Sequence, residues 1–342
     1  MKVAPIITGW TVDREPEIAA FVADHPQGMI YYTPAFRRYL LAMLGGECRS
    51  MLAFEDGRLT GVLPLLAKSG PYGAILNSLP FFGSNGGILA TSAAAEIALR
   101  AEYERVAAKD VVASTWISHP FMEVVPPQHD LTDERIAQWT ELPSGGLDAL
   151  FPNIDSSARR NVQRALAEGV TVRETPEALG FLEKIHRENM GAIGGRAKPR
   201  EFFSCLDQTM TYGRDWRLYL AERGGEELAA LLTFEASQTV EYVMPVVKET
   251  ARGLQPTAAI LSRAMGDAIA RGFTRWNWGG TWLTQQGVYR FKKKWGALER
   301  RYHYYITLND TALRHHSAAG LTEAYPWFYT LPYAALTPTE TI

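Results

Sequence analysis

Three consecutive lysines, Lys292 to Lys294, stand between two aromatic residues late in the sequence. Phe291 and Trp295 are large apolar side chains that anchor such a segment to the body of a protein. Successive side chains between them point in different directions, so we expect at least one lysine to face inward. An inward ammonium group near a concave surface is a fixed positive charge that suits an oxyanion or a phosphate. The alternative is a basic surface loop held by aromatic residues.

A second cationic group belongs to an expected helix that Asp155 or Ser156 caps and that Gly169 ends. Arg159 and Arg160 lie in its first turns, where the helix dipole favours acidic residues. This placement indicates an anionic ligand, since guanidinium groups make planar, bidentate contacts to phosphate. Solvated charge on an exposed helix is an equally good explanation.

A third candidate segment is the turn before the helix that begins at Pro256. The start of a helix exposes backbone N–H groups, and its dipole favours an anion. The turn is therefore a candidate for holding a pyrophosphate or lining a tunnel for an acyl thioester, although a plain loop has the same pattern. The residues expected to line this donor side are Arg252, Gly253, Leu254 and Thr257.

The elements that must position these residues form a pattern that occurs twice. In the first half, Thr33-Pro34 opens a helix, Asp56-Gly57 joins two strands, and a helix over residues 93–108 leads to a strand. In the second half, Gly224-Gly225 joins two strands, and the helix from Pro256 to Arg271 leads to a strand. Each half contains a helix, a hairpin, a third strand, a helix and a strand, which indicates a duplicated unit.

A loop-forming cluster, Pro143 to Gly146, lies between the two copies. We therefore expect an N-terminal domain over residues 1–143 and a C-terminal domain over residues 144–342. The second domain includes an aromatic tail, residues 321–337, which is expected to pack back over a domain.

The composition excludes several classes of protein. With 342 residues, of which 46% are hydrophobic and 21% charged, the chain suits two globular domains. A net charge of -2 lacks the basic footprint of a DNA-binding protein. Cys48 and Cys205 have no partner at a metal-ligand spacing, so no metal is expected. The start lacks a leader pattern and no apolar run approaches the roughly 20 residues of a membrane span, so we expect a cytoplasmic protein.

These features together resemble the FemAB-like acyltransferases. The resemblance is carried by the duplicated unit, the basic helix over residues 158–165, the strand end Asn277-Trp278-Gly279-Gly280, and the segment from Tyr289 to Gly296. It implies an α+β fold of two tandem GNAT-like domains, each a mixed, mostly antiparallel sheet flanked by helices, with the donor site in the C-terminal domain. In peptidoglycan-bridge members of this family the lysine of the last segment stabilises the tetrahedral intermediate. The matching residue is Lys292, with Phe291 beside it.

Two features depart from that family. The long helical-hairpin insertion of some bridge-forming members is absent. Where those members carry an acid near the substrate amine, residues 82–87 here offer Asn85 and no carboxylate. The general base is therefore left open, and an amine of modest pKa needs less help from a base. Asn85 is a candidate for orienting the acceptor, and Tyr242 and Tyr289 are candidate walls of the acceptor pocket.

The function that the resemblance implies is N-acyl transfer from an acyl-CoA co-substrate to a primary amine, with nucleotide-linked amino sugars of the cell envelope among the acceptors. No tightly bound cofactor is expected. The first alternative is a ligase that uses aminoacyl-tRNA to add an amino acid to a peptidoglycan precursor, with Lys292 to Lys294, Arg300 and Arg301 on the tRNA. The second alternative is a non-catalytic module that binds an anionic glycan or nucleotide.

Overall fold

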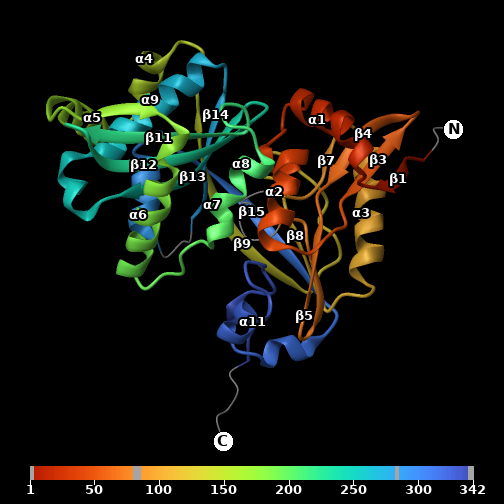
Figure 1. Cartoon of the computed structure of the whole chain (residues 1–342). Coiled ribbons are helices and arrows are strands. Elements are labelled where there is room, and N and C mark those ends of the chain that lie inside the picture. Colours follow the sequence, from red (N-terminus) through yellow and green to blue (C-terminus); the bar gives the residue numbers. More distant parts are fainter. Residues whose placement is uncertain (1–3, 80–85, 282–284, 338–342) are drawn as a thin grey trace, which may run out of the picture. The chain divides into compact units, whose positions relative to one another are not determined.

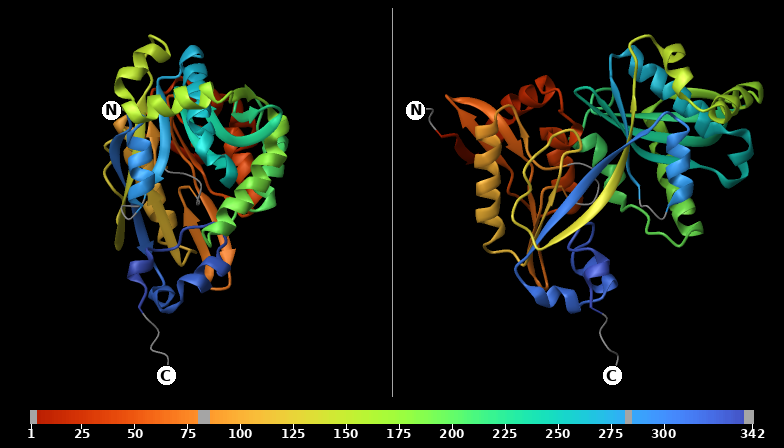
Figure 2. Two further views of the ribbon diagram at one scale, coloured as in Figure 1. Left: turned by 90° about the vertical axis from the view of Figure 1, so that its left-hand side faces the viewer. Right: turned by 180° about the vertical axis from the view of Figure 1, so that it is seen from behind.

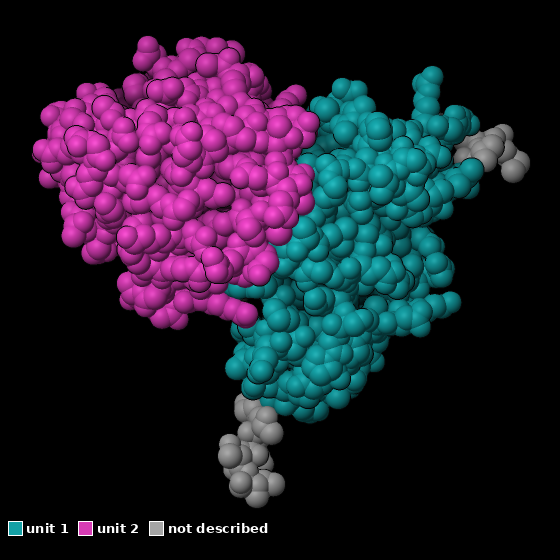
Figure 3. All heavy atoms as spheres, in the orientation of Figure 1, with its two compact units in different colours: residues 1–136, 301–342 teal, residues 137–300 magenta. Residues whose placement is uncertain are grey.

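The protein is described from a computed structural model that covers residues 4–79, 86–281 and 285–337 (Figure 1). The chain forms two compact units: residues 137–300 make up unit 2, and residues 1–136 together with 301–342 make up unit 1 (Figure 3). Both boundaries fall inside strands, because β9 (Leu131–Glu141) and β15 (Leu298–Leu308) each have residues in both units.

Unit 2 is built on a sheet with the strand order β10-β11-β12-β13-β14-β9. The first four strands are antiparallel neighbours, and β14 runs parallel to β13. Gly224 and Gly225 join β11 to β12 with φ of +57° and +83°, the left-handed conformation that a two-residue hairpin turn requires. The strands are β10 (Thr171–Glu174), β11 (Trp216–Arg223), β12 (Glu226–Ala236), β13 (Thr239–Val247) and β14 (Arg275–Thr281).

Helices cover both faces of this sheet (Figures 1 and 2). One core joins α5 and α9 to alternate residues of the strands and includes Trp276, Trp278 and Trp295. The helix α6 contacts β12 and β13 through residues outside that core, such as Leu182 and Ile185. The helices are α4 (Leu147–Leu150), α5 (Ser156–Ala167), α6 (Leu179–Ala192), α7 (Arg200–Ser204), α8 (Leu206–Thr209), α9 (Pro256–Ala270) and α10 (Gln286–Lys293), with 3-10 turns at Phe151–Asn153, Pro176–Ala178 and Glu249–Leu254.

Unit 1 contains a sheet in the order β1-β3-β4-β7 and a ladder in the order β15-β8-β6-β5-β2. Its β3–β4 hairpin turns at Asp56 and Gly57, with φ of +49° and +77°, as the sequence predicted. In this unit β6 and β8 are parallel and α3 connects them, which repeats the β13–α9–β14 arrangement of unit 2. The strands are β1 (Ile6–Gly9), β2 (Glu47–Cys48), β3 (Met51–Glu55), β4 (Arg58–Leu63), β5 (Leu66–Gly70), β6 (Gly73–Asn77), β7 (Leu89–Ala90) and β8 (Ala113–Ile117).

The core of unit 1 lies between its strands and α3, where Leu99, Tyr103 and Trp116 are buried. Thr33 caps α2 through its side-chain oxygen, which accepts from the Phe36 N–H, and Pro34 is the first helical residue, as expected. The helices are α1 (Glu15–Asp24), α2 (Pro34–Leu44), α3 (Ala93–Ala107) and α11 (Ala318–Ala324), with 3-10 turns at Val12–Arg14, Ile30–Tyr32, Thr311–His315 and Tyr333–Ala335.

The two units differ from the division expected at residue 143. Residues 301–337 were expected in the C-terminal domain, but they pack with unit 1. Tyr304 to Leu308 pair with β8, and the hydroxyl of the buried Tyr325 donates to the Gly73 carbonyl at 3.0 Å. The reason is that a strand pairs with the strand beside it in the sheet, however far apart the two lie along the chain. The aromatic tail does pack back over a domain, although over the first.

Candidate active site

The candidate site begins where β13 and β14 separate. The parallel ladder between them pairs Thr239 with Arg275, Val240 with Trp276 and Glu241 with Asn277, and among the described residues it ends there. A register shift on β12 leaves Val243 of β13 as an extra residue, a β-bulge just beyond the last pair. Bulges bend and twist a strand. Within the described residues, the facing edges of β13 and β14 are therefore not paired with each other beyond this point, and such edges suit an extended ligand.

A buried polar pair marks the point of divergence. Glu241 and Asn277 are 2% and 0% exposed, and Asn277 Nδ2 donates to Glu241 Oε2 at 2.7 Å. The Gly279 N–H donates to Asn277 Oδ1 at 2.8 Å. Gly279 has φ of +72°, a conformation that favours glycine over residues with a Cβ. The pair thus fixes the bend at the end of β14.

Lys292 is the buried lysine of the basic segment. It lies on α10, is 4% exposed, and its Nζ donates to Thr281 Oγ1 at 2.8 Å and to the carbonyls of Gly280 at 3.1 Å and Gly279 at 3.4 Å. Burial lowers the pKa of Lys292 to about 8. Within the described parts of the chain no carboxylate forms an ion pair with it. A buried cation without a counter-ion is costly, which makes it a functional candidate.

The strand β9 holds α10 at both ends, and sequence reasoning missed it. Gln138 Nε2 donates to the Tyr289 carbonyl at 3.2 Å, near the start of α10. Thr140 Oγ1 donates to the Trp295 carbonyl at 2.9 Å, just after its end. The alternation of apolar and polar residues from Ala137 to Thr140 is the only signal in the sequence, and it is too short to predict a strand with its partner.

The aromatic residues around Lys292 are not equally buried. Trp295 is 1% exposed, as expected of an anchor, whereas Phe291 is 36% exposed and meets the Trp278 ring edge-on at 6.2 Å. Trp278 also lies 4.9 Å from the ring of Tyr242. Burial raises the pKa of Tyr242. Tyr242, Trp278 and Phe291 therefore form a connected aromatic cluster beside the diverging strands.

Tyr289, the other expected wall of the acceptor pocket, is half-buried on α10. Its hydroxyl donates to the side chain of Glu299. The structure thus places Tyr289 in a polar contact of its own, whereas Tyr242 belongs to the aromatic cluster. Asn85 lies outside the described residues.

The basic helix and the lysine segment are neighbours. The Asp155 N–H, at the start of α5, donates to the Lys294 carbonyl at 2.8 Å, and Asp155 Oδ1 caps α5 by accepting from the Ser157 N–H. Hydrogen bonds from Ser157 hold the pKa of Asp155 below its usual value, and the charges of Lys294 and Arg160 add to this effect. The structure therefore gathers an exposed cationic surface, made of Arg159, Arg160, Lys293 and Lys294.

The expected donor-side residues precede α9. Arg252, Gly253 and Leu254 belong to the 3-10 turn Glu249–Leu254, and Thr257 lies in the first turn of the helix. Arg252 is exposed and pairs with Glu249 at 2.7 Å. This turn follows β13 directly, so the chain brings it to the far end of the same diverging strand.

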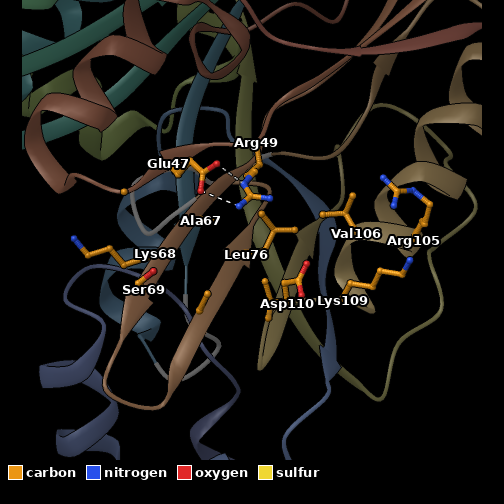
Figure 4. A pocket seen from close by; sticks show the side chains of 13 residues that line it. Glu47, Arg49, Ala67, Lys68, Ser69, Leu76, Arg105, Val106, Lys109 and Asp110 are labelled. Atoms are coloured by element: carbon orange, nitrogen blue, oxygen red, sulfur yellow. Dashed lines mark hydrogen bonds and ion pairs between the residues drawn. The ribbon is translucent and has the colours of Figure 1, made fainter.

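Unit 1 has a hollow of its own, of about 380 Å³ (Figure 4). Three of the cations that line it already have partners: Arg49 pairs with Glu47 at 2.7 Å, Arg105 pairs with Glu102 at 2.6 Å, and Lys68 donates to a backbone carbonyl at 2.8 Å. All three bonds form at or near the surface, in contrast to the buried Lys292. We therefore place the candidate site in unit 2.

Two classes of feature are not found in the described part of the chain. It contains no group of three or more His, Cys, Asp or Glu side chains placed to hold a metal ion. None of its helices is long and apolar enough to span a membrane.

The chain is similar in sequence to an acetyltransferase family and in fold to several solved structures. Residues 154–293 match the family described as acetyltransferase (GNAT) domain. The crystal structure of FemX is 16% identical with a TM-score of 0.66, over 93% of this chain and 99% of that one. The C-terminal domain of a putative lysylphosphatidylglycerol synthetase from Agrobacterium fabrum is 10% identical with a TM-score of 0.56, over 94% and 100%. A tandem GNAT protein from the clavulanic acid biosynthesis pathway is 13% identical with a TM-score of 0.50, over 90% and 99%.

No curated protein matches the sequence. Residues 154–293, which include α5, the diverging strands and Lys292, nevertheless form a GNAT acyltransferase domain. The chain as a whole has the tandem GNAT fold of the FemAB-like proteins, so the expected fold is confirmed. The expected enzyme class is confirmed through this domain: the protein is an acyltransferase of the GNAT type.

Proposed function

We propose that the protein transfers an acyl group from an acyl-CoA thioester to a primary amine, and that nucleotide-linked amino sugars are the first acceptors to test. The observation that carries this proposal is Lys292, a buried ammonium without a carboxylate partner among the described residues, at the end of one of two diverging strands. Such an ammonium group stabilises negative charge that develops beside it, as on the oxygen of a tetrahedral intermediate.

The three N–H bonds of Lys292 are not equivalent. Those to Thr281 at 2.8 Å and to Gly280 at 3.1 Å are ordinary hydrogen bonds, whereas the contact with the Gly279 carbonyl at 3.4 Å is long. The first two bonds hold the ammonium group in place. The third N–H makes only the long contact, so it can donate to an acyl oxygen instead with the smallest loss of hydrogen-bond energy.

In the reaction, the neutral amine attacks the carbonyl carbon of the thioester and forms the C–N bond. The carbonyl electron pair moves onto oxygen, where Lys292 stabilises the charge. Collapse of the intermediate breaks the C–S bond, and the leaving thiolate takes up the proton that the amine nitrogen gives up. The products are an amide and a free thiol.

The remaining predicted site residues are assigned to substrate binding. In this proposal Arg159 and Arg160 contact the phosphates of the acceptor, and Tyr242 and Tyr289 line the acceptor pocket. Phe291 shields Lys292 beside Trp278, where the two rings meet. The donor side is formed by Arg252, Gly253, Leu254 and Thr257.

An aminoacyl-tRNA donor is the second candidate, because the cationic surface of α5 and α10 lies next to the buried lysine. A nucleic acid binds such a surface through its phosphates, and its affinity falls steeply with salt. In that case the acceptor is a peptidoglycan precursor. One measurement separates the two donors, because only an enzyme that uses acyl-CoA is expected to be stabilised against unfolding by an added CoA ester.

Thermal unfolding with acetyl-CoA and longer acyl-CoAs tests the proposal. We expect the unfolding midpoint to rise with the concentration of at least one CoA ester, and free thiol to appear when an amine acceptor is added. Lys292→Met should lower kcat by about 10²–10³, the typical effect of losing one oxyanion donor. Lys184→Met, a change of an exposed lysine on α6, should act like wild type. No stabilisation by any CoA ester would overturn the acyl-CoA donor, and equal turnover of the two variants would overturn the role of Lys292.

A further inference from the structure

For each hydrogen bond around Gln138, the donor and the acceptor follow from the chemical groups involved. The Tyr289 carbonyl only accepts, so the amide nitrogen of Gln138 must face it, at 3.2 Å. This leaves Gln138 Oε1 facing Thr281 Oγ1 at 3.0 Å. A carbonyl oxygen also only accepts, so the Thr281 hydroxyl must donate to it. The lone pairs of Thr281 Oγ1 are then free to accept from Lys292 Nζ at 2.8 Å.

This arrangement is closed to water. Gln138 is 0% exposed, and Thr281 and Lys292 are each 4% exposed. The side chain comes from β9, the hydroxyl from the end of β14 and the ammonium from α10, so the network ties three elements together. Buried polar networks of this kind hold a single arrangement, because any unpaired group in them is costly.

We propose that Gln138 is a positioning residue for the transfer reaction: by directing the Thr281 hydroxyl away from Lys292, it holds the ammonium so that one N–H remains for the acyl oxygen. This inference rests on the proposed function and adds two residues to its machinery. Neither Gln138 nor Thr281 contacts the substrate in this scheme; both act through Lys292.

The direction of the Thr281 hydroxyl has a second consequence. Among the described residues, the groups that hydrogen-bond to Lys292 Nζ are uncharged: the carbonyls of Gly279 and Gly280 and the Thr281 hydroxyl from β14, with Gln138 of β9 behind it. In Gln138→Leu the hydroxyl is released and is able to donate to the neutral amine of Lys292, which favours the neutral form. In Gln138→Glu a carboxylate lies one hydrogen bond away, which favours the ammonium. The two substitutions therefore move the lysine's titration in opposite directions.

The experiment has two independent readouts. The titration of Lys292 is followed by NMR of its labelled Nζ in the full chain without substrate, with Lys292→Met used to assign the signal. Acyl transfer is followed separately as kcat and KM. For Gln138→Leu we expect a lower titration midpoint and a fall of about tenfold in kcat with KM little changed, the cost of misplacing one stabilising group. For Gln138→Glu we expect a higher midpoint.

Matched variants separate the positioning role of Gln138 from a general loss of structure. Gln163→Leu, on the exposed face of α5, should change neither readout. Thr281→Ser keeps the hydroxyl and should act like wild type, whereas Thr281→Val should reproduce the loss in kcat even if Gln138→Leu fails to fold. Midpoints that shift together in the leucine and glutamate variants, or do not shift at all, would overturn the positioning role. Opposite shifts in a protein that transfers no acyl group would support the network and overturn the proposed function instead.

Discussion

At the scale of single residues, the three adjacent lysines have different environments at the end of α10. Lys292 is buried, as is Trp295 just after the helix, whereas Lys293, the last residue of α10, and Lys294, its C-cap, are exposed. The inward lysine predicted from the sequence is therefore present. A pattern of residue types cannot tell which of the three it is, since that choice depends on the rotation of α10 against β9 and β14.

The pKa of Lys292 predicts how stability changes with pH. The side chain titrates near 10.5 in an unfolded chain and at about 8 when folded, because burial disfavours its charge. Between these values the unfolded state binds more protons, so the free energy of unfolding rises with pH across the window from about 8 to 10.5. At 1.36 kcal/mol per unit, we expect a gain of roughly 2 kcal/mol between pH 8 and 9.5 relative to Lys292→Met.

Urea unfolding of the wild type and of Lys292→Met over this pH range measures the difference. Lys293→Met serves as the control and should follow the wild type. Acyl transfer should fall over the same range, as the ammonium that stabilises the oxyanion is lost. Parallel stability curves for the wild type and Lys292→Met would show that the lysine titrates as it does in water.

At the scale of elements, α10 depends on a strand that is distant in sequence. Thr140 joins two buried aromatic residues, since it accepts from Trp278 Nε1 at 2.9 Å and donates to the Trp295 carbonyl at 2.9 Å. We expect Thr140→Val, which keeps the shape, to cost about 1–3 kcal/mol, because it leaves a buried donor and a buried acceptor without partners.

The cost appears as a lower midpoint in urea unfolding at an unchanged slope, with Trp fluorescence as the signal. Thr140→Ser keeps both hydrogen bonds and should recover most of the loss. If the valine variant proved as stable as the wild type, the hydrogen bonds that link β9 to the end of α10 would contribute nothing to the stability of the fold.

Local signals predicted most elements but only part of the candidate site. The hairpins at Asp56-Gly57 and Gly224-Gly225, and the helices α3, α5 and α9, follow from turn and cap residues a few positions apart. The strand β9 was missed, and with it Gln138 and Thr140. Their role exists only through partners about 140 to 155 residues away in the chain, and no local pattern encodes such a pairing.

At the scale of the whole molecule, the same limit explains the division of the chain. The loop at residues 143–146 is a sound local signal for a boundary between the two copies. The structure nevertheless ends unit 1 inside β9 and returns to it inside β15. The two copies of the unit are thus sequential in the chain, but the compact units are not, because β15 supplies the strand that β8 pairs with.

A fragment of residues 1–143 should therefore not fold on its own, although it contains one complete copy of the repeated pattern. It lacks the residues of β15 that pair with Ala113 to Ile117 of β8, which leaves an open strand edge. It also lacks Tyr325, which is 0% exposed and packs so closely on Gly70 that a Cβ there would clash with its ring. The amide dispersion of the fragment in NMR, compared with that of the full chain, measures this. A well-dispersed spectrum with cooperative unfolding would mean that residues 301–337 cover unit 1 without being needed for its core.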